Sequence, residues 1–125
     1  MTISQAITYA DNAMPNNMPH PEKLRHLSVL DGRVRRELID RCEGGPSKPF
    51  CPYEARENFD PNAELTVPAP YDEIYIHYLG AMIAHAEGEP QRYEACKSMF
   101  DTLSAAFAAD YMRDHKPRGG AGFRF

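Results

Sequence analysis

Residues 70–111 read PYDEIYIHYLGAMIAHAEGEPQRYEACKSMFDTLSAAFAADY, and this stretch decides the fold. In its second part an apolar or aromatic residue recurs every three or four positions, at Tyr93, Cys96, Phe100, Leu103, Phe107 and Tyr111. That spacing predicts an amphipathic helix. The first part is expected to form a helix from Pro70 to Gly88, and its middle is apolar on nearly every side, at Ile74, Ile76, Tyr78, Leu79, Met82 and Ile83. It predicts a buried helix that is covered on several sides, by this chain or by a neighbouring subunit. The turn at 87–90 is so short that the two helices should form an antiparallel hairpin.

Two more helices are predicted in the first 45 residues. The shorter one covers residues 2–12. The longer one begins at Pro21, in a first turn where the missing amide costs nothing, and ends at the glycine pair 44–45. Asp31 and Gly32 interrupt the middle of its apolar stripe. The stripe consists of Leu24, Leu27, Leu30, Val34 and Leu38.

The segment at residues 46–69 is rich in proline and polar residues, and we expect it to be extended. A loop of this length inside a compact domain tends to have a function or to be ordered by a partner. Its aromatic anchors Phe50 and Tyr53 are candidate partner-binding residues, and 50–53 could pair with 64–67 as a short β-hairpin. The predicted fold is therefore mainly α: a small helical domain over residues 1–117 with a long helical hairpin and one extended loop.

Residues 118–125, RGGAGFRF, form a glycine-rich tail. Glycine-rich chain is flexible on its own, whereas aromatic residues and arginine are enriched at interfaces. We predict that Arg118, Phe123, Arg124 and Phe125 contact a partner, in the manner of a segment that becomes ordered on binding. A frayed terminus, or a charged tail that only keeps the protein soluble, is the alternative.

The composition fits one soluble domain: 125 residues, of which 42% are hydrophobic and 26% charged. The charge is uneven. Residues 49–110 hold three Lys or Arg against eleven Asp or Glu, a net charge of −8, whereas residues 111–125 hold four against one, a net charge of +3. Such an acidic body disfavours wrapping nucleic acid, which needs clustered basic residues. The three cysteines form no C-x-x-C pair, which favours a reducing cytoplasm, and no apolar run approaches the ~20 residues of a membrane span.

No residue pattern predicts catalysis, a cofactor or a metal site. The sequence lacks both the G-x-S-x-G motif and a phosphate-binding glycine loop. Cys42, Cys51, His77 and His85 could be drawn as a zinc set, but no two of them have the short spacing that zinc ligands usually show. We therefore expect a protein that is not an enzyme.

Five stretches, taken in order, carry a resemblance to known proteins. They are LSVLDGR at 27–33, RELIDRCEG at 36–44, FCPY at 50–53, LTVPAPYDEIY at 65–75, and FDTLSAAFAADY at 100–111 with DHKP at 114–117. With these motifs the chain resembles, over about residues 2–118, the head-tail connector (adaptor) proteins of tailed bacteriophages. VPAPYDE at 67–73 is the most specific piece. Similar sequences often carry Trp where this one has His26, and Asn where it has Glu94 and Ala95.

The resemblance implies a structural protein of the virion neck that is assembled in the host cytoplasm. Such connectors form a homo-oligomeric ring, a dodecamer, beneath the portal protein. The ring extends the DNA channel and offers a docking surface to a stopper or tail-completion protein. DNA would only pass through this channel, and an acidic wall would help it pass because like charges repel. Neither a cofactor nor a membrane is implied.

Two interpretations from other classes stay open. A small helical phage or bacterial regulatory or binding module would share the helical hairpin and the acidic charge, but it would ignore portal proteins. A small enzyme would reveal itself by a tightly bound metal or cofactor in the purified protein.

Overall fold

A computed structural model of the chain describes residues 1–54 and 59–118. Within these residues four α-helices follow one another: α1 (Ile3–Ala13), α2 (His20–Glu37), α3 (Ile74–Ala86) and α4 (Pro90–Asp114). A short 3-10 turn, η1 (Ile39–Arg41), comes directly after α2. The described segments contain no strand, and the prediction of a small, mainly α domain is confirmed.

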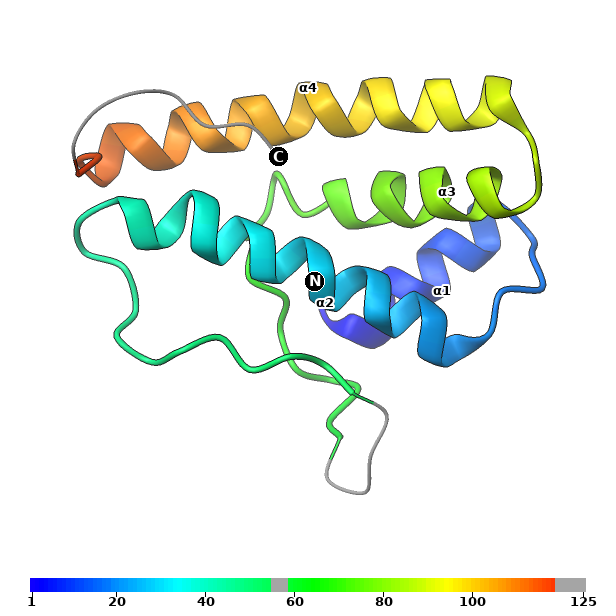
Figure 1. Cartoon of the computed structure of the whole chain (residues 1–125), viewed down its shortest axis with the longest axis horizontal. Coiled ribbons are helices and arrows are strands. Elements are labelled where there is room, and N and C mark those ends of the chain that lie inside the picture. The colour runs from blue at the N-terminus through cyan, green and yellow to red at the C-terminus, as the bar shows by residue number, and fades with distance from the viewer. Residues whose placement is uncertain (55–58, 119–125) are drawn as a thin grey trace.

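The helical hairpin has the predicted form, with α3 and α4 antiparallel and side by side (Figure 1). Gly88 turns the chain between them with a φ of 69°, a conformation that glycine adopts at no steric cost. Gly80 lets the two helices approach closely, because a Cβ atom built there would lie only 3.0 Å from the Cys96 Sγ. The aromatic stripe of α4 faces inward, and Phe100 and Phe107 on it are buried.

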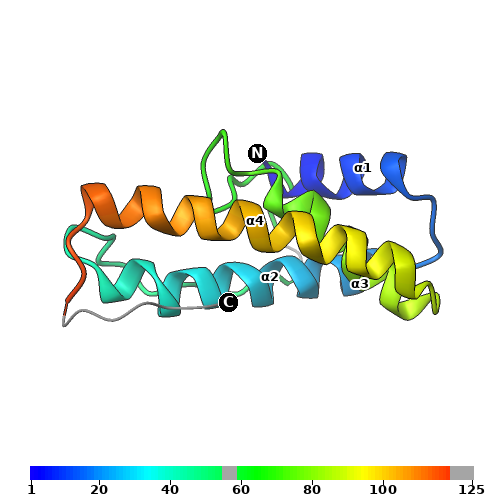
Figure 2. The same cartoon turned by 90° about the horizontal axis from the view of Figure 1, so that it is seen from above.

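α3 is buried on several sides, as its sequence predicts, and its own chain supplies the cover. It packs against α4, α1 and α2 (Figures 1 and 2). Ile74, Leu79 and Ile83 on this helix are fully buried. The helix begins at Ile74, later than the predicted Pro70, because residues 70–73 form successive turns in which the Ile74 amide donates to the Tyr71 carbonyl at 3.2 Å.

The two N-terminal helices differ from prediction mainly at their ends. α1 is closed by a capping box: the Gln5 amide donates to the Thr2 hydroxyl at 3.1 Å, and the Thr2 amide donates to the Gln5 side chain at 3.0 Å. α2 ends at Glu37, before the predicted glycine pair. The early end coincides with η1, through which the buried residues Ile39 and Cys42 join the core.

The predicted pairing of 50–53 with 64–67 is wrong, although the long extended loop is present. Neither stretch is a strand. The later arm of the loop pairs with the start of the chain instead, through an isolated bridge between Thr2 and Glu64. The Ile3 amide donates to the Ala63 carbonyl at 3.1 Å, and the Leu65 amide donates to the Met1 carbonyl at 3.0 Å. The amides of Thr66 and Val67 donate to the side chains of Asp31 and Tyr75, so the amides of residues 65–67 are all bonded outside residues 50–53.

Candidate functional site

The polar centre of the molecule is Asp31, the residue that interrupts the apolar stripe of α2. Its side chain is fully buried, at 0% exposure. A buried carboxylate is costly unless its oxygens are hydrogen-bonded, and here they accept from three donors. Tyr75 Oη donates to Oδ1 at 2.5 Å, and Tyr53 Oη donates to Oδ2 at the same distance. The backbone amide of Thr66 donates to Oδ2 at 3.0 Å.

These residues come from three different parts of the fold, and we call them the Asp31 cluster (Asp31, Tyr53, Thr66 and Tyr75). Tyr75 lies in the first turn of α3 and also accepts a hydrogen bond from the Val67 amide, at 2.7 Å. The Tyr53 amide donates to the hydroxyl of Ser28 on α2, at 2.9 Å. Both arms of the long loop are thereby tied to α2, and the second arm is tied to α3 as well.

The electrostatics of the Asp31 cluster favour a structural role over a catalytic one. Burial raises the pKa of Asp31, while the hydrogen bonds from Tyr53, Tyr75 and Thr66 act in the opposite direction. Burial also raises the pKa of both tyrosines, and the negative charge of Asp31 raises it further. The tyrosines therefore keep their protons, and a substrate in solvent cannot reach the Asp31 carboxylate.

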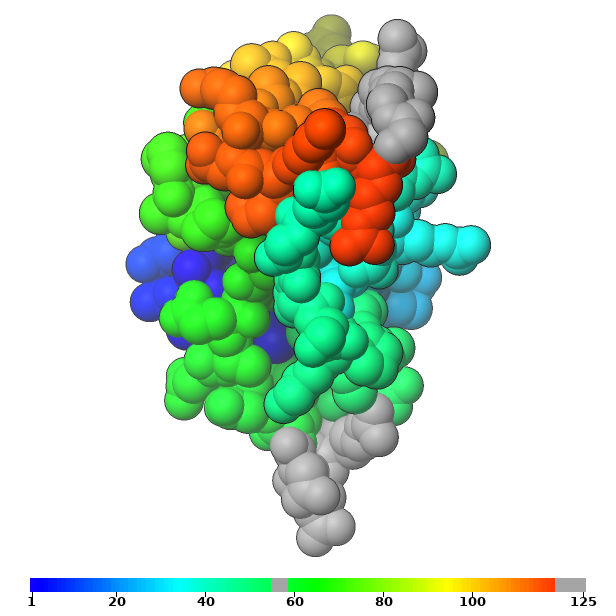
Figure 3. All heavy atoms as spheres, turned by 90° about the vertical axis from the view of Figure 1, so that its left-hand side faces the viewer, coloured from blue at the N-terminus to red at the C-terminus, as the bar shows by residue number. Residues whose placement is uncertain are grey.

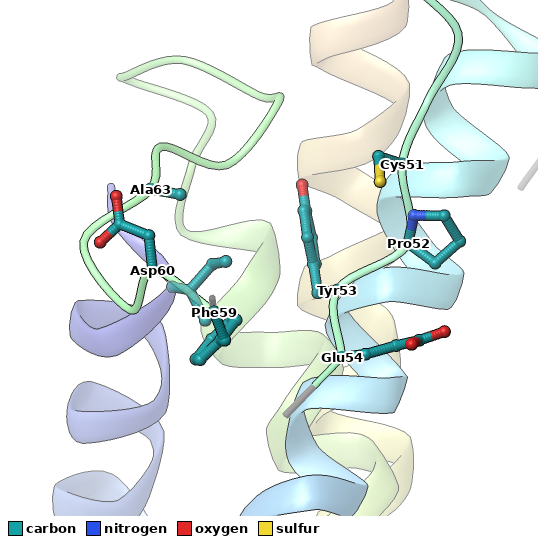
Figure 4. Close-up of a pocket in the computed structure, with 8 residues that line it drawn as sticks. Cys51, Pro52, Tyr53, Glu54, Phe59, Asp60 and Ala63 are labelled. Carbon is teal, nitrogen blue, oxygen red and sulfur yellow. The ribbon is translucent and has the colours of Figure 1, made fainter. Parts of the chain in front are cut away.

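A cleft opens beside the cluster, on the ring of Tyr53. Its volume is about 350 Å³. Figure 4 shows its two sides: Phe59, Asp60 and Ala63 lie beside α1, and Cys51, Pro52 and Glu54 lie beside α2. We call this hollow the loop cleft. It is lined by Ile3, Cys51, Pro52, Tyr53, Glu54, Phe59, Asp60 and Ala63.

Two segments that are far apart in the sequence also meet where α4 ends. The chain after α4 runs beside the chain after α2, with an isolated bridge between Cys42 and Pro117. The amide of Arg118 donates to the Arg41 carbonyl at 2.7 Å. The imidazole of His115 stacks on Tyr111, with 3.9 Å between ring centroids. The last described residue is therefore held against the body of the protein.

The structure places only part of the predicted partner-binding set. Phe50 and Tyr53 are half-buried and pack against each other edge to face, with ring centroids 5.5 Å apart. Arg118 is exposed next to η1. The other three predicted residues, Phe123, Arg124 and Phe125, lie outside the described residues.

Sequence reasoning missed the Asp31 cluster. We interpreted Asp31 as a break in an apolar stripe and assigned no separate role to Tyr75. The available signal was the acid itself, because a single acid inside an apolar stripe needs buried donors. The sequence does not identify those donors, since Tyr53 and Tyr75 lie 22 and 44 positions away.

Across residues 1–54 and 59–118, no three His, Cys, Asp or Glu side chains are placed to hold a metal ion. Of the residues that could be drawn as a zinc set, Cys42 is buried whereas Cys51 and His85 are exposed. None of the helices in the described part combines the length and the apolar character needed to cross a membrane.

No protein-family model matches the chain, and neither the curated proteins nor the solved structures include a significant match to it.

Proposed function

We propose that this protein is a head-tail connector subunit of a tailed bacteriophage, which forms a ring beneath the portal protein in the neck of the virion. The ring would extend the channel through which DNA leaves the head, and it would offer a docking surface to a stopper or tail-completion protein. The proposal rests on the resemblance of five ordered stretches to such connectors.

The observation that supports it is where these stretches lie in the fold. LSVLDGR at 27–33, FCPY at 50–53 and LTVPAPYDEIY at 65–75 supply all members of the Asp31 cluster. RELIDRCEG at 36–44 meets DHKP at 114–117 where α4 ends, and the Glu43 amide donates there to the Lys116 carbonyl at 2.9 Å. The shared motifs are thus the residues that tie distant segments together, so a chain that keeps them in this order is expected to keep this fold.

The physical character of the chain is compatible with a ring subunit. Such a subunit needs no reactive group, and the buried Asp31 carboxylate of this chain already accepts hydrogen bonds from three donors. Residues 49–110 carry a net charge of −8, and an acidic channel wall would repel the phosphates of passing DNA. Replacing channel-facing acids with Lys should slow DNA ejection, and unchanged ejection would refute this electrostatic role.

A gene-deletion experiment in the source phage tests the function. Without this protein we expect heads that are filled with DNA but lack tails, because the portal would have no extension on which the rest of the neck could assemble. Supplying the intact gene in trans should restore tailed particles. Normal tailed, infectious particles after deletion would refute the proposal. They would favour a small regulatory or binding module instead.

A further inference from the structure

The loop cleft combines an apolar floor with acidic groups at its edge. The floor includes the buried residue Ile3 and the half-buried rings of Tyr53 and Phe59. Glu54 and Asp60 are the charged residues among those that line the cleft, and both are exposed. Its volume of about 350 Å³ is in the range of cavities that hold ligands of drug size. The cleft therefore suits a segment that carries apolar rings next to a positive charge.

The chain itself contains a segment of this chemistry. Residues 118–125 hold two Arg and two Phe and no acid, and Phe123-Arg124-Phe125 places one cation between two rings. Aromatic residues, Phe among them, and arginine are enriched at protein interfaces relative to the rest of the surface. Three glycines separate this triplet from the helical body, at positions 119, 120 and 122.

We propose that Phe123-Arg124-Phe125 of one copy docks in the loop cleft of the next copy. A phenylalanine ring packs against Ile3, Tyr53 and Phe59, and the Arg124 guanidinium faces Asp60 at the edge of the cleft. This contact deepens the proposed function and rests on it for the expectation that copies assemble as a ring. It names the surfaces by which neighbouring subunits recognise each other.

The location of the two surfaces favours a contact between copies. Arg118, from which the docking segment starts, is held against Arg41 near the end of α4. Figure 3 shows the last described residues (red) in the upper half of the molecule, whereas the described part of the loop (green) extends into its lower half. A contact that joins two different surfaces of identical copies is head-to-tail, and it closes into a ring when the rotation permits. The seven residues 119–125 span at most ~25 Å when extended, which allows them to bridge to an adjacent copy.

A cysteine pair tests the contact directly, because Cys51 is exposed and lines the loop cleft. The full chain with Gly122→Cys, which keeps both phenylalanine rings, is placed in a Cys96→Ala background, oxidised mildly at several protein concentrations and run on a denaturing gel. Disulfides form only when the two Cα atoms come within ~7 Å, so a link between Cys51 and the new tail thiol, which we call the tail–cleft link, reports proximity. We expect a ladder of covalent oligomers, and we expect Cys51→Ser to abolish it. A disulfide closed within one chain, or a ladder that persists without Cys51, would overturn the proposal, and so would the absence of any link.

A charge exchange tests the pairing of Arg124 with Asp60 in the same assay. Each single variant, Arg124→Glu and Asp60→Lys, should lower the yield of the tail–cleft link at least about tenfold, because each brings like charges together. An equimolar mixture of the two should recover it, since the tail of each variant then meets a cleft of opposite charge on the other variant. Asp60→Asn, which keeps an acceptor for the Asn62 amide, is the control for damage to the turn. The pairing of Arg124 with Asp60 would be overturned if both single variants formed the tail–cleft link at the normal yield. It would also be overturned if the mixture did not recover that yield.

These readouts need no portal protein, so they separate the contact from the proposed function. If the protein forms linked oligomers but binds no portal, the proposed contact stands and the connector role is refuted. If the protein binds its portal without forming the tail–cleft link, the connector role stands and the proposed contact is refuted.

Discussion

Replacing Tyr75 with Phe removes a single hydroxyl group, and two partners inside the core lose their hydrogen bonds. Tyr75 Oη donates to Asp31 at 2.5 Å and accepts from the Val67 amide at 2.7 Å. A hydrogen bond to a charged group contributes about 1.5–3 kcal/mol, and a buried amide left without an acceptor costs about 1–3 kcal/mol. We therefore expect Tyr75→Phe to lower the free energy of unfolding by about 3–5 kcal/mol, a large share of the ~5–15 kcal/mol of a typical domain.

The same reasoning ranks two further variants. Tyr53→Phe loses one hydrogen bond to Asp31, at a half-buried position where water can replace it in part, so its cost should be smaller, about 1–2 kcal/mol. Tyr9→Phe is the matched control. Tyr9 is 46% exposed, and its replacement should change the free energy of unfolding by less than about 0.5 kcal/mol.

Urea unfolding followed by circular dichroism measures all three variants. The cost of Tyr75→Phe should also depend on pH. The Tyr75 hydroxyl stabilises the charged form of Asp31, so Tyr75→Phe should raise the folded-state pKa of Asp31 further. The cost is greatest where Asp31 is charged in both proteins, and it shrinks as the pH falls from the pKa of Asp31 in the variant to the pKa in the wild type. A loss below about 1 kcal/mol for Tyr75→Phe, or a larger loss for Tyr53→Phe, would refute the account of the Asp31 cluster.

Three further predictions concern the packing and the pH response. The Cβ of Gly80→Ala would lie 3.0 Å from Cys96 Sγ, a crowding of about 1–3 kcal/mol that is opposed by the ~1 kcal/mol by which a helix interior favours Ala over Gly, so we expect a net loss of at most about 2 kcal/mol. In a Cys96→Ala background the same change should be neutral or stabilising in the urea assay. Phe107→Ala should cost about 3–5 kcal/mol, since that ring is only 3% exposed, and a loss below about 1 kcal/mol would mean that the stripe of α4 does not pack in the core. Burial lowers the pKa of His26 below 6.5, so the unfolded chain binds more protons as the pH falls through that value. Acidification from pH about 7 to 5 should therefore destabilise the protein in part through His26, and His26→Gln should flatten this pH dependence; an unchanged slope would contradict that assignment.

Local patterns in the sequence predicted the helices because each depends on residues close together in the chain. The recurrence from Tyr93 to Tyr111 defines α4, and the proline-rich segments correctly separate the helices. The ends were less predictable. Pro70 could start a helix by its chemistry, yet α3 begins at Ile74, since the intervening residues form turns that carry Tyr71 onto the ring of Phe107.

The candidate site depends on long-range contacts that no local pattern contains. In the sequence, Asp31 is a single acidic residue inside the apolar stripe of an amphipathic helix. Only the fold brings Tyr53, Thr66 and Tyr75 next to it. Residues 64–67 have the alternation of a strand, but the start of the chain competes for their backbone groups. The loop cleft is a further product of this arrangement, because its two sides are the two arms of one loop.

The most direct test of the connector proposal is light scattering on a sizing column, for the protein alone and after mixing with the portal protein encoded in the same genome. The proposal predicts a stoichiometric ring complex, with many copies of this chain bound to each portal ring, whatever the oligomeric state of the free protein. A well-folded monomer or dimer that elutes apart from the portal at every salt concentration tested would contradict it.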